Sequence, residues 1–196
     1  MEDISLHILD IAENSVNAGA TFVRISIVEQ NAEDLFTIEI EDNGKGMTEE
    51  FLKKVLDPFC TTRTTRTVGL GLSLLAQSAR ETGGDMVVHS ELNKGTVVTA
   101  YFRLSHIDMK PLGNVAETIT TLIAGNPRVD ILFHCARGER KYLLDTREIR
   151  SALEEVPINS SEVLSAIRND LLEALQGFFA HRPRARSTKE AGNVPL

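Results

Sequence analysis

Two stretches near the N-terminus, in which apolar and polar residues alternate, constrain the fold of this chain most strongly. They are Thr21–Glu29 and Leu35–Asp42, and only a short polar segment separates them. Alternation with a period of two is typical of strands that bury one face, and a short connection makes two such strands a hairpin. Residues 85–91 and 95–104 repeat this arrangement around a glycine-containing turn. The sequence therefore predicts a sheet that contains two antiparallel hairpins.

Helical patterns precede and separate the two hairpins. From Ile8 onward, small and apolar residues recur at positions i, i+3, i+4 and i+7, which is the spacing of one helix face. Residues 48–56 and 72–81 are also predicted as helices, and residues 57–71, rich in Thr, Arg and Gly, as a long loop between them. This order of elements predicts an α/β fold in which a mixed sheet has its helices gathered on one side. We assign it to one domain, residues 1–105.

Residues 106–180 are predicted to form a small α+β unit of their own. Its helical and strand patterns are separated by short polar turns and cover residues 115–124, 129–136, 141–145, 146–155 and 161–179. No segment here gathers acidic, histidine or cysteine side chains into a site, so we expect this unit to contact a second copy of the chain or another protein. Residues 181–196 are polar, contain proline and are locally basic, and we expect them to be disordered.

The charge balance excludes several classes of partner. The chain has 21 basic and 28 acidic residues, a formal net charge of −7, whereas proteins that hold DNA or RNA cluster basic side chains against the phosphates. No run of about 20 apolar residues is present to span a membrane, and the acidic N-terminus lacks the basic region of a signal peptide. The two cysteines, Cys60 and Cys135, have no zinc-site spacing. We therefore expect a cytoplasmic protein that binds neither nucleic acid nor membrane.

Four sequence blocks follow one another along the first domain. They are DIAENSVNAGA (10–20), EDNGKGM (41–47), DPFCTTR (57–63) with VGLGL (68–72), and KGT (94–96), and neither a P-loop nor a complete dinucleotide fingerprint accompanies them. Together the blocks resemble the asparagine, glycine, phenylalanine and Gly-Thr boxes of the GHKL ATPase superfamily. That superfamily includes histidine-kinase catalytic domains and the gyrase, heat-shock-chaperone and mismatch-repair ATPases. The resemblance implies the Bergerat fold, a two-layer α/β sandwich, with ATP and Mg²⁺ as ligands.

At the adenine end of the implied site, Asp42 matches the aspartate that accepts a hydrogen bond from the adenine amino group. Gly44 and Gly46 match glycines that let the backbone approach the base, Met47 ends that box, and Thr96 matches the residue that reaches the adenine edge. A buried carboxylate acceptor in this position would discriminate against guanine, which carries an oxygen there.

At the phosphate end, the resemblance assigns Asn14 to Mg²⁺ coordination and Asp10, one helical turn earlier, to the role of general base. Asn17 lies on the same polar helix face. The loop 57–71 would be the ATP lid, and the residues expected to meet the phosphates there are Thr61, Thr62, Arg63, Gly69, Leu70 and Gly71. Most of the superfamily has Glu in place of Asp10, and an aspartate is about 1.5 Å shorter. We therefore expect weak intrinsic ATPase activity, with Glu13 as the second choice for the base.

Three functions are compatible with these motifs. The first is slow γ-phosphoryl transfer or hydrolysis of Mg-ATP in signalling, by a kinase or ATPase of histidine-kinase type with an unidentified protein acceptor. The alternative is an ATP-dependent interaction switch with little or no catalysis, and the third is an anti-sigma-type serine kinase. Full histidine kinases place a dimerising hairpin with the phospho-accepting histidine before this domain, and no such hairpin fits before the first block. The layout resembles stand-alone ATP-binding proteins with a C-terminal extension. A homodimer is compatible with this layout. We interpret His7 as a half-exposed histidine rather than as an autophosphorylation site.

Overall fold

The computed structural model describes residues 3–56 and 70–179. Its helices are α1 (Ile4–Asn17), α2 (Glu49–Leu56), α3 (Leu70–Glu81), α4 (Val115–Gly125), α5 (Thr146–Leu153) and α6 (Ser161–Phe179). Its strands are β1 (Phe22–Gln30), β2 (Leu35–Asp42), β3 (Asp85–Glu91), β4 (Gly95–Arg103), β5 (Asp130–Arg137) and β6 (Arg140–Asp145). A short 3-10 turn, Asn31–Glu33, connects β1 to β2. Every helix and strand predicted from the periodicity is present, with ends that differ by a few residues.

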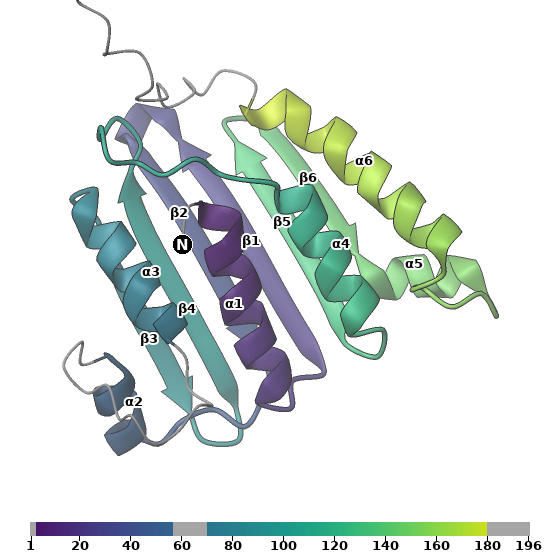
Figure 1. Ribbon diagram of the computed structural model, residues 1–196, viewed down its shortest axis with the longest axis horizontal. Helices are drawn as coiled ribbons and strands as arrows, with labels where there is room; N and C mark the ends of the chain where they lie inside the picture. The colour runs from purple at the N-terminus through teal and green to yellow at the C-terminus, as the bar shows by residue number, and fades with distance from the viewer. Residues whose placement is uncertain (1–2, 57–69, 180–196) are drawn as a thin grey trace, which may run out of the picture.

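The strands form one six-stranded sheet in the order β3-β4-β2-β1-β5-β6. Neighbouring strands are antiparallel except β1 and β5, which are parallel and make the sheet mixed. Figure 1 shows α1, α3, α4 and α6 side by side over one face of this sheet. The predicted α/β fold, with a mixed sheet and its helices on one side, is confirmed.

The hydrophobic core lies between the helix layer and the covered face of the sheet. Alternate residues of β1 and β2 are buried, as their patterns predict, and Phe36 and Phe102 meet across β2 and β4 with their ring centroids 6.0 Å apart. From the helix layer, Ile4, Ile8 and Leu75 are almost completely buried in the same core. No helix in the described part of the chain is long and apolar enough to cross a membrane.

Residues beyond 105 extend this sheet, and no break in it marks the predicted domain boundary. Strand β5 pairs with β1 so that Phe133 lies opposite Ile25, and Phe133 is fully buried in the common core. The backbone of α1 also bonds to the segment before α4, where the amide of Ile4 donates to the carbonyl of Pro111 over 3.0 Å. The C-terminal helices and strands thus complete the first unit, although their predicted role in protein contacts stays a prediction. The predicted tail, 181–196, lies outside the described residues.

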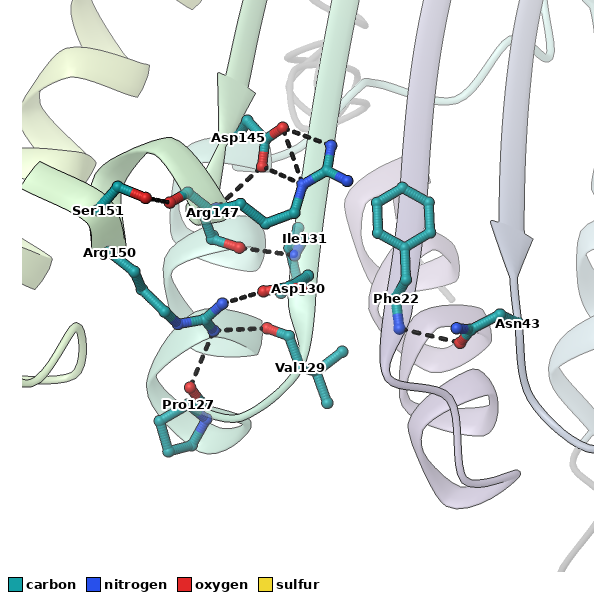
Figure 2. Close-up of polar contacts among 11 residues, drawn as sticks. Phe22, Asn43, Pro127, Val129, Asp130, Ile131, Asp145, Arg147, Arg150 and Ser151 are labelled. Atoms are coloured by element: carbon teal, nitrogen blue, oxygen red, sulfur yellow. Dashed lines mark hydrogen bonds and ion pairs between the residues drawn. The ribbon is translucent and has the colours of Figure 1, made fainter.

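Polar contacts fix the ends of β1 and β5 that lie beside α5 (Figure 2). The guanidinium of Arg150 in α5 donates to the carbonyls of Pro127 and Val129, over 2.9 and 2.8 Å, and pairs with Asp130. On β1, the amide of Phe22 donates over 2.9 Å to Oδ1 of Asn43, which belongs to the block EDNGKGM. The start of β1 is therefore tied to the glycine turn that follows β2.

Candidate functional site

A cleft of about 570 Å³ opens between the C-terminal half of α1, the glycine turn after β2, and the ends of β3 and β4. Its walls are largely apolar and include Ile11, Leu72, Leu92 and Val98. Of the residues predicted for nucleotide binding, those that line it are Asn14, Asn17, Asp42, Gly46, Met47 and Thr96. An apolar cleft with a few convergent polar groups is the usual form of a small-molecule site.

Asp42 lies buried at the base of this cleft, and two donors fix its carboxylate. The amide of Gly44 donates to Oδ1 over 2.8 Å, and the hydroxyl of Ser15 donates to Oδ2 over 2.7 Å. Each carboxylate oxygen keeps a lone pair for a further donor. The sequence places Ser15 on the packing face of its helix and misses its contact with Asp42. The available signal was a hydroxyl directly after Asn14 on a face that is otherwise apolar or small.

Thr96 joins Asp42 because of strand register. The two residues lie directly opposite each other on β4 and β2, so their side chains emerge on the same face of the sheet. The Oγ1 of Thr96 lies 2.9 Å from Oγ of Ser90, which also accepts the amide of Met47 over 2.9 Å. Ser90 therefore connects the glycine turn to both strands of the second hairpin, and nothing in the sequence pattern indicated it.

Gly46 is required by the backbone and by its surroundings together. Its φ of +61° is in the left-handed region, and an added Cβ would lie 2.0 Å from the carbonyl oxygen of Glu91. This close approach packs the glycine turn against the end of β3. Glycine at this position thus shapes the floor of the cleft.

Asp10 and Gly71 come together beside Asn14, and of these three residues only Asn14 lines the cleft. A Cβ built on Gly71, in the first turn of α3, would lie 1.6 Å from Oδ2 of Asp10 and 3.7 Å from Nδ2 of Asn14. Within the described residues, Oδ2 of Asp10 is buried without a hydrogen-bond partner, and burial raises the pKa of this carboxyl. Glu13, the second choice for the base, is exposed and is not among the residues that line the cleft.

Most of the predicted lid lies between the two described segments of the chain. Thr61, Thr62, Arg63 and Gly69 lie outside the described residues, as does the rest of the predicted lid up to that point. Leu70 is described only as the first residue of α3. The lid therefore stays a prediction.

His7 is buried, and its interpretation as a half-exposed histidine is wrong. Only 1% of its surface is exposed, and neither ring nitrogen has a partner in the described part of the chain. Burial, together with Lys110 and the N-terminus, lowers the pKa of His7 to about 4. The ring is therefore neutral at pH 7, and its burial keeps both ring nitrogens away from a phosphoryl group.

The described residues contain no cluster of three or more His, Cys, Asp or Glu that could hold a metal ion by themselves. At the predicted phosphate end, the available oxygen ligand is the side-chain amide of Asn14, with the carboxyl of Asp10 one helical turn away. Such a set suits a hard cation that takes most of its oxygen ligands from phosphates and water.

Comparison with known proteins agrees with this geometry. Tetrathionate sensor histidine kinase of Salmonella typhimurium is 34% identical over an alignment that covers 47% of the present chain. Sporulation kinase E of Bacillus subtilis is 38% identical over an alignment that covers 45% of the present chain. These alignments cover 16% and 12% of the two kinases, so the chain spans only a small part of the curated relatives it matches. Among solved structures, the N-terminal domain of a DNA repair protein shares the fold with a TM-score of 0.52 at 15% identity. That match covers 81% of this chain and 59% of the other.

A family model supplies the remaining comparison. The model described as histidine kinase-, DNA gyrase B- and HSP90-like ATPase matches residues 2–106, which contain every residue of the cleft. This match supports ATP as the ligand of the cleft and confirms the resemblance inferred from the four sequence blocks. The chain therefore belongs to the family of histidine kinase-, DNA gyrase B- and HSP90-like ATPases.

Proposed function

We propose that this chain binds Mg-ATP and slowly transfers or hydrolyses its γ-phosphate, as a kinase or ATPase of histidine-kinase type. The observation that carries the proposal is the Asp42 carboxylate, buried under an apolar cleft and held by Ser15 and Gly44. A carboxylate fixed in this way is an acceptor for an exocyclic amino group such as that of adenine. Guanine presents an oxygen there, which the carboxylate would repel.

The phosphate groups of ATP would extend from the adenine toward Asn14 and Asp10. The amide oxygen of Asn14 would hold Mg²⁺, which when bound neutralises phosphate charge. Asp10 would accept the proton of the attacking water or hydroxyl, and its raised pKa suits that role because a base works best with a pKa near the working pH. The acceptor of the phosphoryl group would be a protein, and the sensor kinases that match this chain support that class of function.

One observation favours a second function, an ATP-dependent interaction switch with little turnover. Oδ2 of Asp10 is packed against Gly71 and lacks a hydrogen bond among the described residues. Because an aspartate is about 1.5 Å shorter than the glutamate common at this position, a carboxylate held here leaves a longer gap to a water at the γ-phosphate, and a misplacement of 1 Å costs on the order of 100-fold in rate. Under this reading, ATP would order a binding surface for a protein partner.

Phosphate release from γ-labelled ATP distinguishes the two functions, measured with the protein in excess over nucleotide. Release that requires Mg²⁺, disappears in Asn14→Ala and falls strongly in Asp10→Asn supports phosphoryl transfer. Binding of ATP without release over hours supports the switch.

A second arm tests the site itself. In isothermal titration, Asp42→Ala should lose ATP binding, because the adenine acceptor is removed. Asp85→Ala, at an exposed residue of β3 that pairs with Arg80 and does not line the cleft, should bind ATP like the parent chain. Unchanged affinity in Asp42→Ala would overturn the proposed adenine site.

A further inference from the structure

Asp10 of α1 and Gly71 of α3 approach each other closely beside Asn14. A methyl group on Gly71 would overlap the carboxylate of Asp10, with 1.6 Å to Oδ2 and 2.8 Å to Cγ. Real Cβ atoms essentially never come within 3.0 Å of another heavy atom. The carboxylate therefore occupies the volume that any other residue at position 71 would need for its side chain.

The backbone of Gly71 gives no other reason for glycine. Gly71 lies in the first turn of α3, and it is absent from the glycines with positive φ, unlike Gly46. Glycine within a helix lowers stability relative to alanine because the unfolded chain has more freedom to lose. Apart from the Asp10 carboxylate, the nearest side-chain atom to the missing Cβ is Nδ2 of Asn14, at the ordinary contact distance of 3.7 Å. The space taken by the Asp10 carboxylate thus explains why position 71 is a glycine.

We propose that Gly71 is a positioning residue for the Asp10 carboxylate: by lacking a side chain, it lets the carboxylate seat against α3 in the orientation from which it accepts a proton. This inference rests on the proposed function, in which Asp10 is the general base. It gives Gly71 a steric role, in addition to the phosphate contact that the family resemblance implies for its backbone amide. An alanine at position 71 keeps that amide and changes only the space.

The consequence of Gly71→Ala is specific. The group in its way is the tip of a side chain rather than backbone, so the carboxylate of Asp10 can turn away while the fold persists. Asp42 and Thr96, at the adenine end, are not near the added methyl. The rate of phosphate release should therefore fall while the affinity for ATP stays close to that of the parent chain.

A double-mutant cycle on stability tests the contact independently of catalysis. Four chains are compared by thermal unfolding: the parent, Gly71→Ala, Asp10→Ala and the double variant. Gly71→Ala should lower Tm in the parent but raise it by about 2–4 °C in the Asp10→Ala background, where the space is free and alanine is the better helix former. Gly125→Ala is the matched control, because Gly125 is also helical and its Cβ would meet nothing within 4 Å. It should not lower Tm in either background.

Equal effects of Gly71→Ala in both backgrounds would overturn the proposal, since the cost would then not come from Asp10. The kinetic arm measures single-turnover phosphate release and ATP affinity by titration. We expect the rate to fall by about 10- to 100-fold in Gly71→Ala with an ATP affinity within about 2-fold. A parallel loss of affinity and rate, or an unchanged rate, would contradict a positioning role.

The two proposals fail in different ways. If the parent chain binds ATP but releases no phosphate, the proposed catalytic function fails, and the Tm cycle still decides whether Gly71 seats Asp10. If phosphate is released and the Tm cycle shows no coupling, the positioning role fails and the proposed function stands.

Discussion

The hydroxyl of Ser15 donates a 2.7 Å hydrogen bond to Oδ2 of Asp42, although the two residues come from a helix and a strand that are far apart in the sequence. Ser15 is only 3% exposed and Asp42 8%. In such a buried site, a donor to a carboxylate is stronger than in water and fixes its orientation. The fold itself thus sets the orientation of the Asp42 carboxylate, which we propose as the acceptor for the adenine amino group.

Ser15→Ala should weaken ATP binding by about 10-fold, or about 1.4 kcal/mol, because Asp42 loses one of the two donors that orient it. Isothermal titration calorimetry with Mg-ATP measures the change. Ser151→Ala removes a hydroxyl that bonds a helix carbonyl on exposed α5 and should leave the affinity unchanged. An affinity in Ser15→Ala equal to that of the parent would mean that the Ser15 bond does not help to form the acceptor.

Gly46→Ala should destabilise the chain by about 2–4 kcal/mol, because left-handed strain of about 1–2 kcal/mol is joined by a clash with the backbone. Gly138 separates the two terms, since its φ of +58° is similar but an added Cβ would meet nothing within 4 Å. Urea unfolding of Gly138→Ala should show only the strain. If both variants lose the same stability, the carbonyl of Glu91 is not the obstacle that its 2.0 Å distance indicates.

His7 should make the chain less stable in mild acid. The pKa of His7 is about 4 in the folded chain, below its ordinary value of 6.5, so the unfolded chain binds the extra proton between these two pH values. The free energy of unfolding contributed by His7 is present above pH 6.5 and is lost as the pH falls toward 4. A difference of about 2.5 between the two pKa values corresponds to a loss of about 3 kcal/mol.

The measurement is urea unfolding at several pH values between 7 and 4. In His7→Leu the free energy of unfolding should fall less steeply with decreasing pH, because the unfolded variant no longer takes up the proton that His7 binds in the parent. His89→Gln, on an exposed position of β3, should retain the slope of the parent. An identical slope in His7→Leu and the parent would show that other groups cause the acid sensitivity.

Phe133→Ala should unfold the whole chain more easily, by about 3–5 kcal/mol, because Phe133 is fully buried in the core that β5 shares with β1. Leu143→Ala, on the adjacent strand but 60% exposed, should cost less than about 0.5 kcal/mol. Circular dichroism and binding of a fluorescent ATP analogue, followed in the same urea series, should report one shared transition. Loss of the C-terminal structure with the nucleotide cleft still intact would instead indicate two independent units.

Local patterns were sufficient for most of the fold. Alternation in residues 21–29 and 35–42 fixed both strands and the burial of Ile25, Ile27, Ile38 and Ile40, because the two faces of a strand differ in environment. The resemblance of the sequence blocks to the GHKL boxes predicted Asn14, Asn17, Asp42 and Thr96 as nucleotide-binding residues, and all four line one cleft. Each of these features is encoded within a short stretch of sequence.

Contacts between distant segments could not be predicted in this way. The parallel pairing of Ile25 with Phe133 joins segments that no local pattern relates, which is why the sequence predicts a separate unit for residues 106–180. The same reason explains why Ser15 was assigned to packing and why the burial of His7 was missed. The fit of Asp10 against Gly71 depends on the distance between two helices, which is decided only when the core packs.

The parallel pairing of β1 with β5 also sets an order of events during synthesis. Strand β1 ends at Gln30, whereas its second neighbour is complete only at Arg137. At about 5–20 residues per second, the ribosome needs roughly 5–20 s to make the intervening segment. Throughout that interval one edge of β1 has no partner from its own chain, and pairing at such separation is slow in folding. The nascent chain therefore carries an open sheet edge for seconds, and during that time pairing with a strand of another chain competes with folding.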